Sequence, residues 1–154
     1  MPAHKLAQLL IDALASTPRD ISRMLRAEPQ KRWLMAPAPG EWSVAQVVLH
    51  LAQVEVIMRA RFARVIDEDQ PALEMLGAAP DLAETRPDAM ASLRIFTEAR
   101  VETINLLEPV TARGWLRIAQ HSTLGPIKLH QYVRVMINHD TEHLAQMADI
   151  RGGL

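Results

Sequence analysis

Three histidines are the residues of this 154-residue chain whose type and spacing most clearly suggest chemistry. His139 and His143 are four residues apart, so in a helix they would lie ~40° apart on one face. Two imidazoles in that position can converge on one metal ion. His50, in a separate apolar stretch, is a third candidate ligand. Three neutral imidazoles suffice for a catalytic-type divalent site with a position left for water.

Ordinary core histidines are the alternative to a metal site. His139 and His143 fall on a stripe of apolar positions between Met136 and Met147, which points them toward the core. A buried polar group without a partner costs free energy, and either a metal ion or hydrogen bonds could offset that cost. His50 borders the apolar face of its own stretch, or in the alternative faces solvent.

Known metal motifs match this segment poorly. The string HDTEH from His139 to His143 departs from the zinc-protease pattern H-E-x-x-H but matches the inverted pattern H-x-x-E-H. Both protease classes take a third ligand downstream, and no histidine or glutamate follows His143. Di-iron bundles use E-x-x-H repeats, which this sequence lacks. The pattern therefore argues against a metalloprotease and a di-iron protein.

Composition narrows the function classes further. The net charge of −1 provides no overall field toward nucleic acid or anionic membranes, and no basic stripe suggests DNA binding. The absence of cysteine excludes disulfides, thiolate metal sites and a cysteine nucleophile. No apolar run is long enough to span a bilayer, and Gln8 and Asp12 make the N-terminus a poor signal peptide. We therefore expect a cytoplasmic protein.

The elements that must position the histidines are helices. Prolines and glycines delimit four stretches long enough for substantial helices, which predicts an all-α four-helix bundle in a single domain over residues 1–154. The first helix is expected at 3–15, with a break at 16–20 after which helix resumes, or continues with a kink, to about residue 27. Ser43 and Gln46 form a capping-box pattern that starts the second helix.

The second half of the chain is predicted in less detail. The third helix follows Pro87, and the fourth lies within residues 127–151. Residues 67–86 are predicted to be a long surface connection, and residues 108–126 a loop. The best strand candidate, residues 115–119, is short and isolated, so no sheet is expected.

Three segments resemble a known family. The segment PGEWSVAQVVLHL, from Pro39 to Leu51, resembles the second-helix signature of the DinB-like (DinB/YfiT) superfamily, and Glu55 fits its continuation. The segment HDTEHLAQ, residues 139–146, is similar to the fourth-helix signature. The segment HSTLG, residues 121–125, resembles the loop that often precedes that helix. The likeness runs in order along nearly the whole chain.

The resemblance implies a four-helix bundle that holds a divalent metal, often zinc or nickel, and frequently forms homodimers. His50, His139 and His143 stand at the family's ligand positions. Members include thiol transferases that use bacillithiol or glutathione, mycothiol-dependent maleylpyruvate isomerases and proteins described as metal-dependent hydrolases. A small-molecule substrate and a low-molecular-weight thiol cosubstrate are therefore expected, although fold-level likeness supports the metal better than the substrate.

A metal on three neutral imidazoles keeps its double positive charge, so it would lower the pKa of bound water or deprotonate a thiol. We therefore expect a thiol S-transferase or a hydrolase. The alternative is a non-catalytic dimeric bundle, a stress or binding protein whose metal is structural or vestigial. An open coordination position in a solvent-connected pocket would favour catalysis, whereas a closed, dry site would favour a structural metal.

Two further residues are candidates for catalysis. His121 precedes the fourth helix and could reach the metal site as an acid–base group, its alternative being a surface loop histidine. Glu55 lies ~140° around the helix from His50, so it is a candidate supporting carboxylate or a surface charge rather than a ligand.

Two more residues are candidates for substrate binding. Tyr132 shares the helix face of His139 and could line the pocket, although an aromatic residue on that stripe is more often part of the core. Arg61 could bind an anionic group, its alternative being a solvated cation. Asp140 and Glu142 flank the histidine ligands and are expected to be exposed acids.

Overall fold

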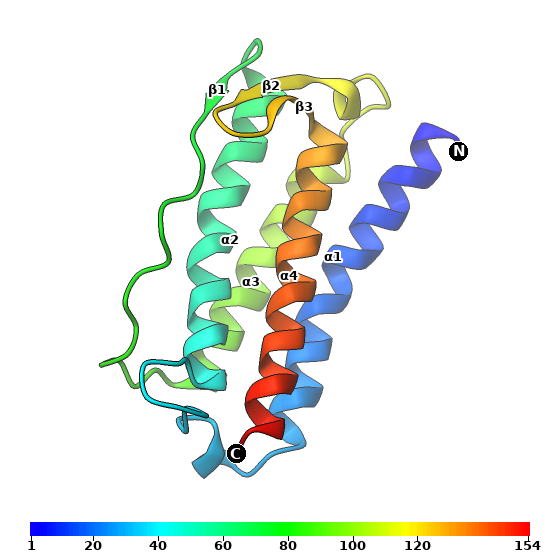
Figure 1. Cartoon of the computed structure of the whole chain (residues 1–154). Helices are drawn as coiled ribbons and strands as arrows, with labels where there is room; N and C mark the ends of the chain where they lie inside the picture. Colours follow the sequence, from blue (N-terminus) through cyan, green and yellow to red (C-terminus); the bar gives the residue numbers. More distant parts are fainter.

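The computed structural model describes residues 1–154, most of which form four long helices (Figure 1). The helices are α1 (Ala3–Arg26), α2 (Val44–Asp67), α3 (Ala89–Leu107) and α4 (Leu129–Gly152). A single 3-10 turn, η1 (Gln30–Arg32), lies between α1 and α2. The predicted four-helix bundle is confirmed. None of its helices has the length and apolar character needed to cross a membrane.

The helix directions require one long return connection. In Figure 1, α2 and α3 run upward while α1 and α4 run downward. Helix α2 packs against α3 and α4, and α1 packs against the same two helices, so the four form a ring. Because α2 and α3 are parallel, residues 68–88 must carry the chain back along the bundle, and they pass beside α2 (Figure 1).

The start of α2 is built as the sequence predicts. Ser43 Oγ accepts from the Gln46 backbone N–H at 3.2 Å, and Gln46 Oε1 accepts from the Ser43 N–H at 2.8 Å. The Gln46 side-chain amide also donates to the carbonyl oxygens of Leu82 and Thr85. The capping residues therefore fix the start of α2, one turn before His50, and also hold the return connection against that end of the helix.

A small sheet closes one end of the bundle, and the sequence-based expectation of no sheet is wrong. After the 3-10 turn η2 (Gly114–Leu116), β2 (Ile118–His121) pairs antiparallel with β3 (Gly125–Lys128) and parallel with β1 (Ala72–Leu73). Strand β1, which pairs with β2, lies in the return connection. The two strands are so far apart along the chain that a local sequence pattern does not predict their pairing. Gly125, with φ of 70°, supplies the left-handed conformation that the hairpin needs.

Helix α1 runs uninterrupted through Pro18, so the predicted break at 16–20 is absent and the alternative, a continuing helix, is the one found. Proline has no N–H, so it cannot bond the carbonyl of Leu14 one turn earlier. That carbonyl instead accepts from Arg100 Nη1 of α3 at 2.8 Å. The bundle thus satisfies the oxygen that proline leaves free.

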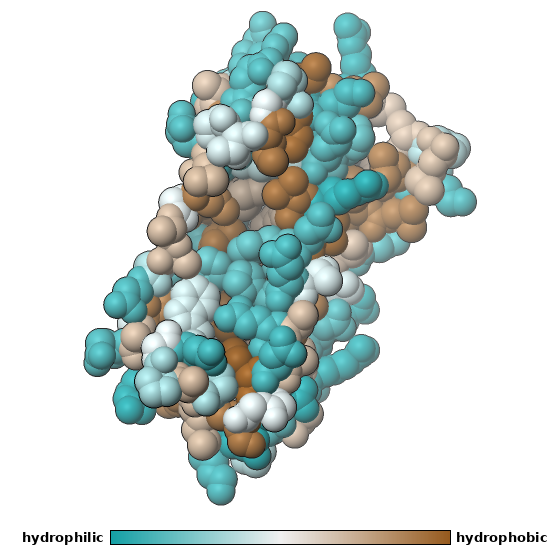
Figure 2. Space-filling model, viewed as in Figure 1, coloured by the Kyte–Doolittle hydropathy of each residue, from teal (hydrophilic) through white to brown (hydrophobic).

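A polar layer divides the apolar core. One apolar cluster lies at the sheet end and includes Phe62, Trp115 and Tyr132, whereas the other lies at the opposite end and includes Leu51 and Phe96. Between the two clusters each helix contributes buried polar residues: Thr17, Glu55, Arg100, Thr103 and Asp140. The outer face is mainly hydrophilic, with apolar side chains in separate patches, the larger ones in the upper half of the view (Figure 2).

Candidate metal centre

The fold brings together the three histidines that the sequence singled out. His50 comes from α2, and His139 and His143 come from α4. His139 Nε2 lies 3.3 Å from His50 Nε2 and 3.0 Å from His143 Nε2. One nitrogen of each ring lies within 4.8 Å of the others, so the three rings present a converging set of donors.

The two Nε2–Nε2 separations of His139 fit a divalent metal ion. Bonds of about 2.0–2.1 Å in a tetrahedral site place ligand nitrogens about 3.3–3.4 Å apart. Hydrogen bonding alone fits less well, because His139 Nε2 carries at most one hydrogen and has a nitrogen on either side. His143 Nδ1 donates to Gln146 Oε1 at 2.7 Å, which leaves the lone pair of His143 Nε2 free to bind a metal.

The protonation states also suit metal binding. Burial, together with smaller contributions from the neighbouring His143 and His139, lowers the pKa of His50 to about 4. Burial likewise lowers the pKa of His139, with a further contribution from His143. Both rings are therefore neutral at neutral pH, which is the form that binds a metal.

The histidine cluster is accessible from outside the core. A groove of about 550 Å³ is lined by His50, His139 and His143, by Trp42 and by residues 76–80 of the return connection. The Trp42 ring lies 5.0 Å from the ring of His50 and is stacked 6.5 Å from that of His143, measured between centroids. The site therefore has one face covered by an aromatic ring and another that borders an open groove.

A second groove, of about 500 Å³, adjoins the other side of His143. It is polar and is lined by Glu41, Trp42, Gln146 and Asp149 among others. Its two acids would disfavour an anionic group on this side.

His121 does not sit on the surface, so the alternative reading as a surface loop histidine is wrong. It ends β2, is 8% exposed and lies with its ring 5.7 Å from that of Tyr132. Its Nδ1 accepts from the backbone N–H groups of Thr123 at 3.2 Å and Leu124 at 3.1 Å. Burial lowers the pKa of His121, and the nearby Arg61 lowers it further. His121, Tyr132 and His139 all line one apolar pocket.

Arg61 contacts Tyr132 directly. Its Nη1 donates to the Tyr132 hydroxyl at 3.1 Å and also to the Glu74 carbonyl. Tyr132 is buried and forms part of the pocket wall, whereas Arg61 holds its hydroxyl from α2. The two residues that the sequence paired with substrate binding thus touch each other.

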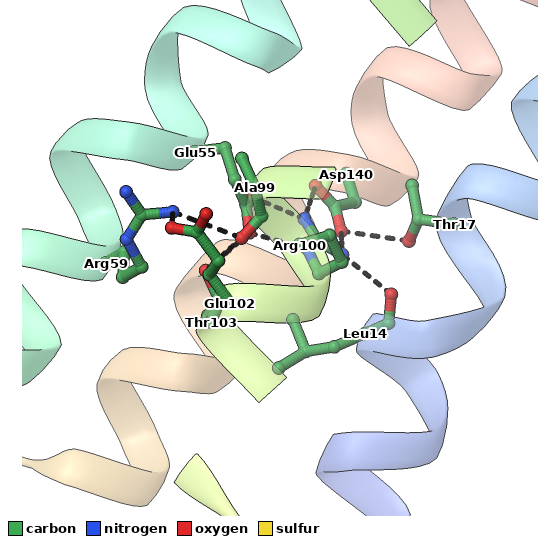
Figure 3. A network of polar contacts seen from close by, with 9 residues as sticks. All are labelled: Leu14, Thr17, Glu55, Arg59, Ala99, Arg100, Glu102, Thr103 and Asp140. Atoms are coloured by element: carbon green, nitrogen blue, oxygen red, sulfur yellow. Dashed lines mark hydrogen bonds and ion pairs between the residues drawn. The ribbon is translucent and has the colours of Figure 1, made fainter. Parts of the chain in front are cut away.

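Glu55 and Asp140 lie in the core and face an arginine (Figure 3). The expectation that Asp140 is an exposed acid is wrong, since this residue is 3% exposed. The alternative interpretation of Glu55 as a surface charge is also wrong, because Glu55 is fully buried. Arg100 bonds both oxygens of each carboxylate and the Leu14 carbonyl, which occupies all five of its N–H groups. Glu142 is exposed, as predicted.

Two threonines complete this network. Thr17 of α1 donates to Asp140 at 2.9 Å, and Thr103 of α3 donates to Glu55 at 2.8 Å. Burial by itself would lower the pKa of Arg100, but the hydrogen bonds that Arg100 donates to Glu55 and the charge of Asp140 raise it above its ordinary value. The network therefore joins all four helices through one fully charged guanidinium, and Asp140 is the residue next to His139.

Sequence reasoning missed Arg100. A signal was present, because Phe96, Arg100, Thr103 and Leu107 recur at intervals of three and four, the spacing of a buried helix face. A charged residue on that face implies buried partners of opposite charge.

Comparison with known proteins agrees with this architecture. The chain is similar in structure to YfiT from Bacillus subtilis, described as a probable metal-dependent hydrolase with an unusual four-helix bundle topology. The TM-score is 0.80 at 22% sequence identity, over 94% of this chain and 85% of that one, which shows a shared fold. None of the curated proteins compared with the chain matches it. The family model of the DinB superfamily matches residues 13–147, which contain all three histidines, and the chain therefore belongs to that superfamily.

Proposed function

We propose that this protein is a divalent-metal-dependent enzyme that acts on a small molecule, with His50, His139 and His143 as the metal ligands. The observation that carries the proposal is the convergence of three imidazole nitrogens, from two helices, beside an open groove. A divalent ion bound there would act as a Lewis acid that lowers the pKa of water or of a thiol. Zinc and nickel both suit a set of imidazole ligands.

The protein's own side chains orient this site. Gln146 fixes the ring of His143 through its Nδ1–H, and Trp42 packs against two of the three rings. We assign Glu55 to holding the helices together rather than to catalysis, because both its oxygens are bonded to Arg100 in the core. His121 is the better candidate for a residue that contacts the substrate.

Hydrolysis and thiol transfer are the two reactions that such a site supports. The description of YfiT as a probable metal-dependent hydrolase favours the first, and the resemblance to thiol transferases of the superfamily favours the second. The non-catalytic alternative, a structural or vestigial metal, is disfavoured by the open groove, since structural sites are closed. On family resemblance we also propose a single-domain homodimer in the cytoplasm.

Metal content tests the site assignment. Elemental analysis of the untagged protein should find about one zinc or nickel per chain, and none in the variant that carries His50→Ala, His139→Ala and His143→Ala. His130→Ala, on the same helix but outside the cluster, should keep the metal. A wild-type protein that binds neither metal, even after incubation with both, would remove the basis for the enzyme.

Activity tests the reaction. The metal-loaded protein should be screened against esters and amides with water as nucleophile, and against electrophiles with low-molecular-weight thiols. Turnover should disappear with a chelator and in His139→Ala, while helical circular dichroism stays intact. A loss of helicity together with the metal would instead indicate a structural ion.

A further inference from the structure

An apolar pocket of about 190 Å³ lies beside His139, between α2, α4, the return connection and the β2–β3 hairpin. Three methionines form much of its wall: Met58, Met75 and Met136. An apolar cavity of about 150 Å³ holds one benzene molecule. This pocket is therefore large enough for one aromatic ring with a small substituent.

His121, in the wall of this pocket, has one ring nitrogen that can donate a hydrogen bond. His121 Nδ1 accepts from two backbone N–H groups, so the hydrogen of the neutral ring is on Nε2, at the opposite edge. None of the hydrogen bonds of His121 involves Nε2. The lowered pKa of the ring keeps it neutral, with that single hydrogen. An Nε2–H in a mostly apolar wall, whose other polar residues are Thr123 and His139, suits a ligand that has one acceptor oxygen.

We infer that this pocket binds the apolar part of a small carbonyl compound, whose carbonyl oxygen accepts a hydrogen bond from His121 Nε2–H. The ring-sized group lies among the three methionines, and the carbonyl carbon lies on the side of His139. This inference rests on the proposed function, since it names the class of substrate that the metal centre takes. A donor in this position would also stabilise negative charge that develops on the oxygen.

Methyl NMR of methionine provides a direct readout. The chain has eight methionines, of which Met58, Met75 and Met136 line the pocket. Titration of the [¹³C-methyl]methionine protein with acetophenone should shift these three signals and leave those of Met24 and Met147 in place. Ethylbenzene, which lacks the oxygen, should bind about threefold to tenfold more weakly, the effect of one neutral hydrogen bond.

Three variants separate the parts of the inference. His121→Phe keeps an aromatic ring but removes the donor, so the two probes should bind equally. Val135→Phe fills the pocket from α4 and should abolish the methionine shifts with both probes. Val56→Phe is the matched control, because it is an exposed valine of α2 outside the pocket and should bind like wild type. Circular dichroism checks the fold of each.

Two results would overturn the inference: no shift at the three pocket methionines, or equal affinity for acetophenone and ethylbenzene in the wild-type protein. Either result, with about one metal still bound per chain, would leave the proposed function standing. Specific acetophenone binding in a protein that takes up no metal would instead contradict the proposed function, because the pocket would then bind its ligand without a metal centre beside it.

Discussion

A single side-chain hydrogen bond determines which nitrogen of His143 faces the other histidines. Gln146 Oε1 can only accept, so His143 Nδ1 carries the hydrogen and Nε2 presents its lone pair. Gln146 follows His143 by three residues on α4, so helix geometry places the two side chains together. At the scale of residues, the proposed metal centre therefore consists of the three candidate ligands and of the group that orients one of them.

The variant Gln146→Ala tests this orienting role. We expect metal affinity to fall by about 10-fold to 100-fold, the usual cost of removing a hydrogen-bond partner of a ligand, with little change in the fold. Competition with a chromophoric chelator measures the affinity. Asn138→Ala, an exposed amide on the same helix, is the control and should bind like wild type. Equal affinities in the two variants would show that Gln146 has no such role.

At the scale of elements, α1 shows how a helix can hold a proline without breaking. Pro18 leaves the Leu14 carbonyl without its helical partner, and Arg100 of the neighbouring helix α3 donates to it at 2.8 Å. The carbonyl that the proline leaves free in α1 is thus the group through which α3 is hydrogen-bonded to α1.

The variant Pro18→Ala tests how much the hydrogen bond from Arg100 to the Leu14 carbonyl contributes to stability. In an ordinary helix interior this change would stabilise by about 3 kcal/mol, because it restores a backbone bond and relieves a clash. We expect a smaller gain here, since the restored N–H must share the Leu14 carbonyl with Arg100. Urea denaturation gives the free energy of unfolding. A gain of the full amount would mean that the contact with Arg100 contributes nothing.

At the scale of the whole molecule, the polar layer sets how the four helices are aligned. Arg100 holds Glu55 of α2 and Asp140 of α4, the two helices that carry the histidines. We infer that this charged layer keeps α2 and α4 in the register at which His50 meets His139. A core with only apolar residues would allow the helices to pack in more than one register.

Removal of the arginine should be costly. Arg100→Leu leaves two buried carboxylates without a cation, and we expect a loss of about 3–5 kcal/mol in the free energy of unfolding. The triple variant Glu55→Leu, Arg100→Leu and Asp140→Leu should be more stable than Arg100→Leu alone, because no charge is left unpaired. Urea denaturation of the two proteins compares them, and the reverse order of stability would refute this account.

Acid should destabilise the metal-free protein. The pKa of His50 is about 4 in the folded chain and near 6.5 when unfolded, so below 6.5 the unfolded chain binds more protons. Stability is therefore complete above pH 6.5 and is lost as the pH falls toward 4. Urea denaturation of chelator-treated protein between pH 7 and 4 measures the loss, and His50→Gln should show a smaller one. Equal losses would assign the effect to other groups.

The sequence alone determined what depends on neighbours along the chain. The Ser43–Gln46 cap, the four helices and the i, i+4 pair of His139 and His143 follow from helix geometry, which acts within a few residues. The apolar spacing around His50 made it a third candidate ligand, and the family resemblance placed all three histidines at ligand positions. The resemblance also implied a bundle that the structure confirms.

Only the tertiary structure decided what depends on partners far apart in the chain. It placed Asp140 against Arg100, His121 in the wall of a pocket, and β1 beside β2. Pairing of this kind arises from the packing of whole elements. Local spacing could mark Arg100 as buried, but it does not encode which residues are its partners. For that reason the sequence could name the three candidate ligands, whereas the partners of the polar layer and the pocket beside the histidines became visible only in the folded chain.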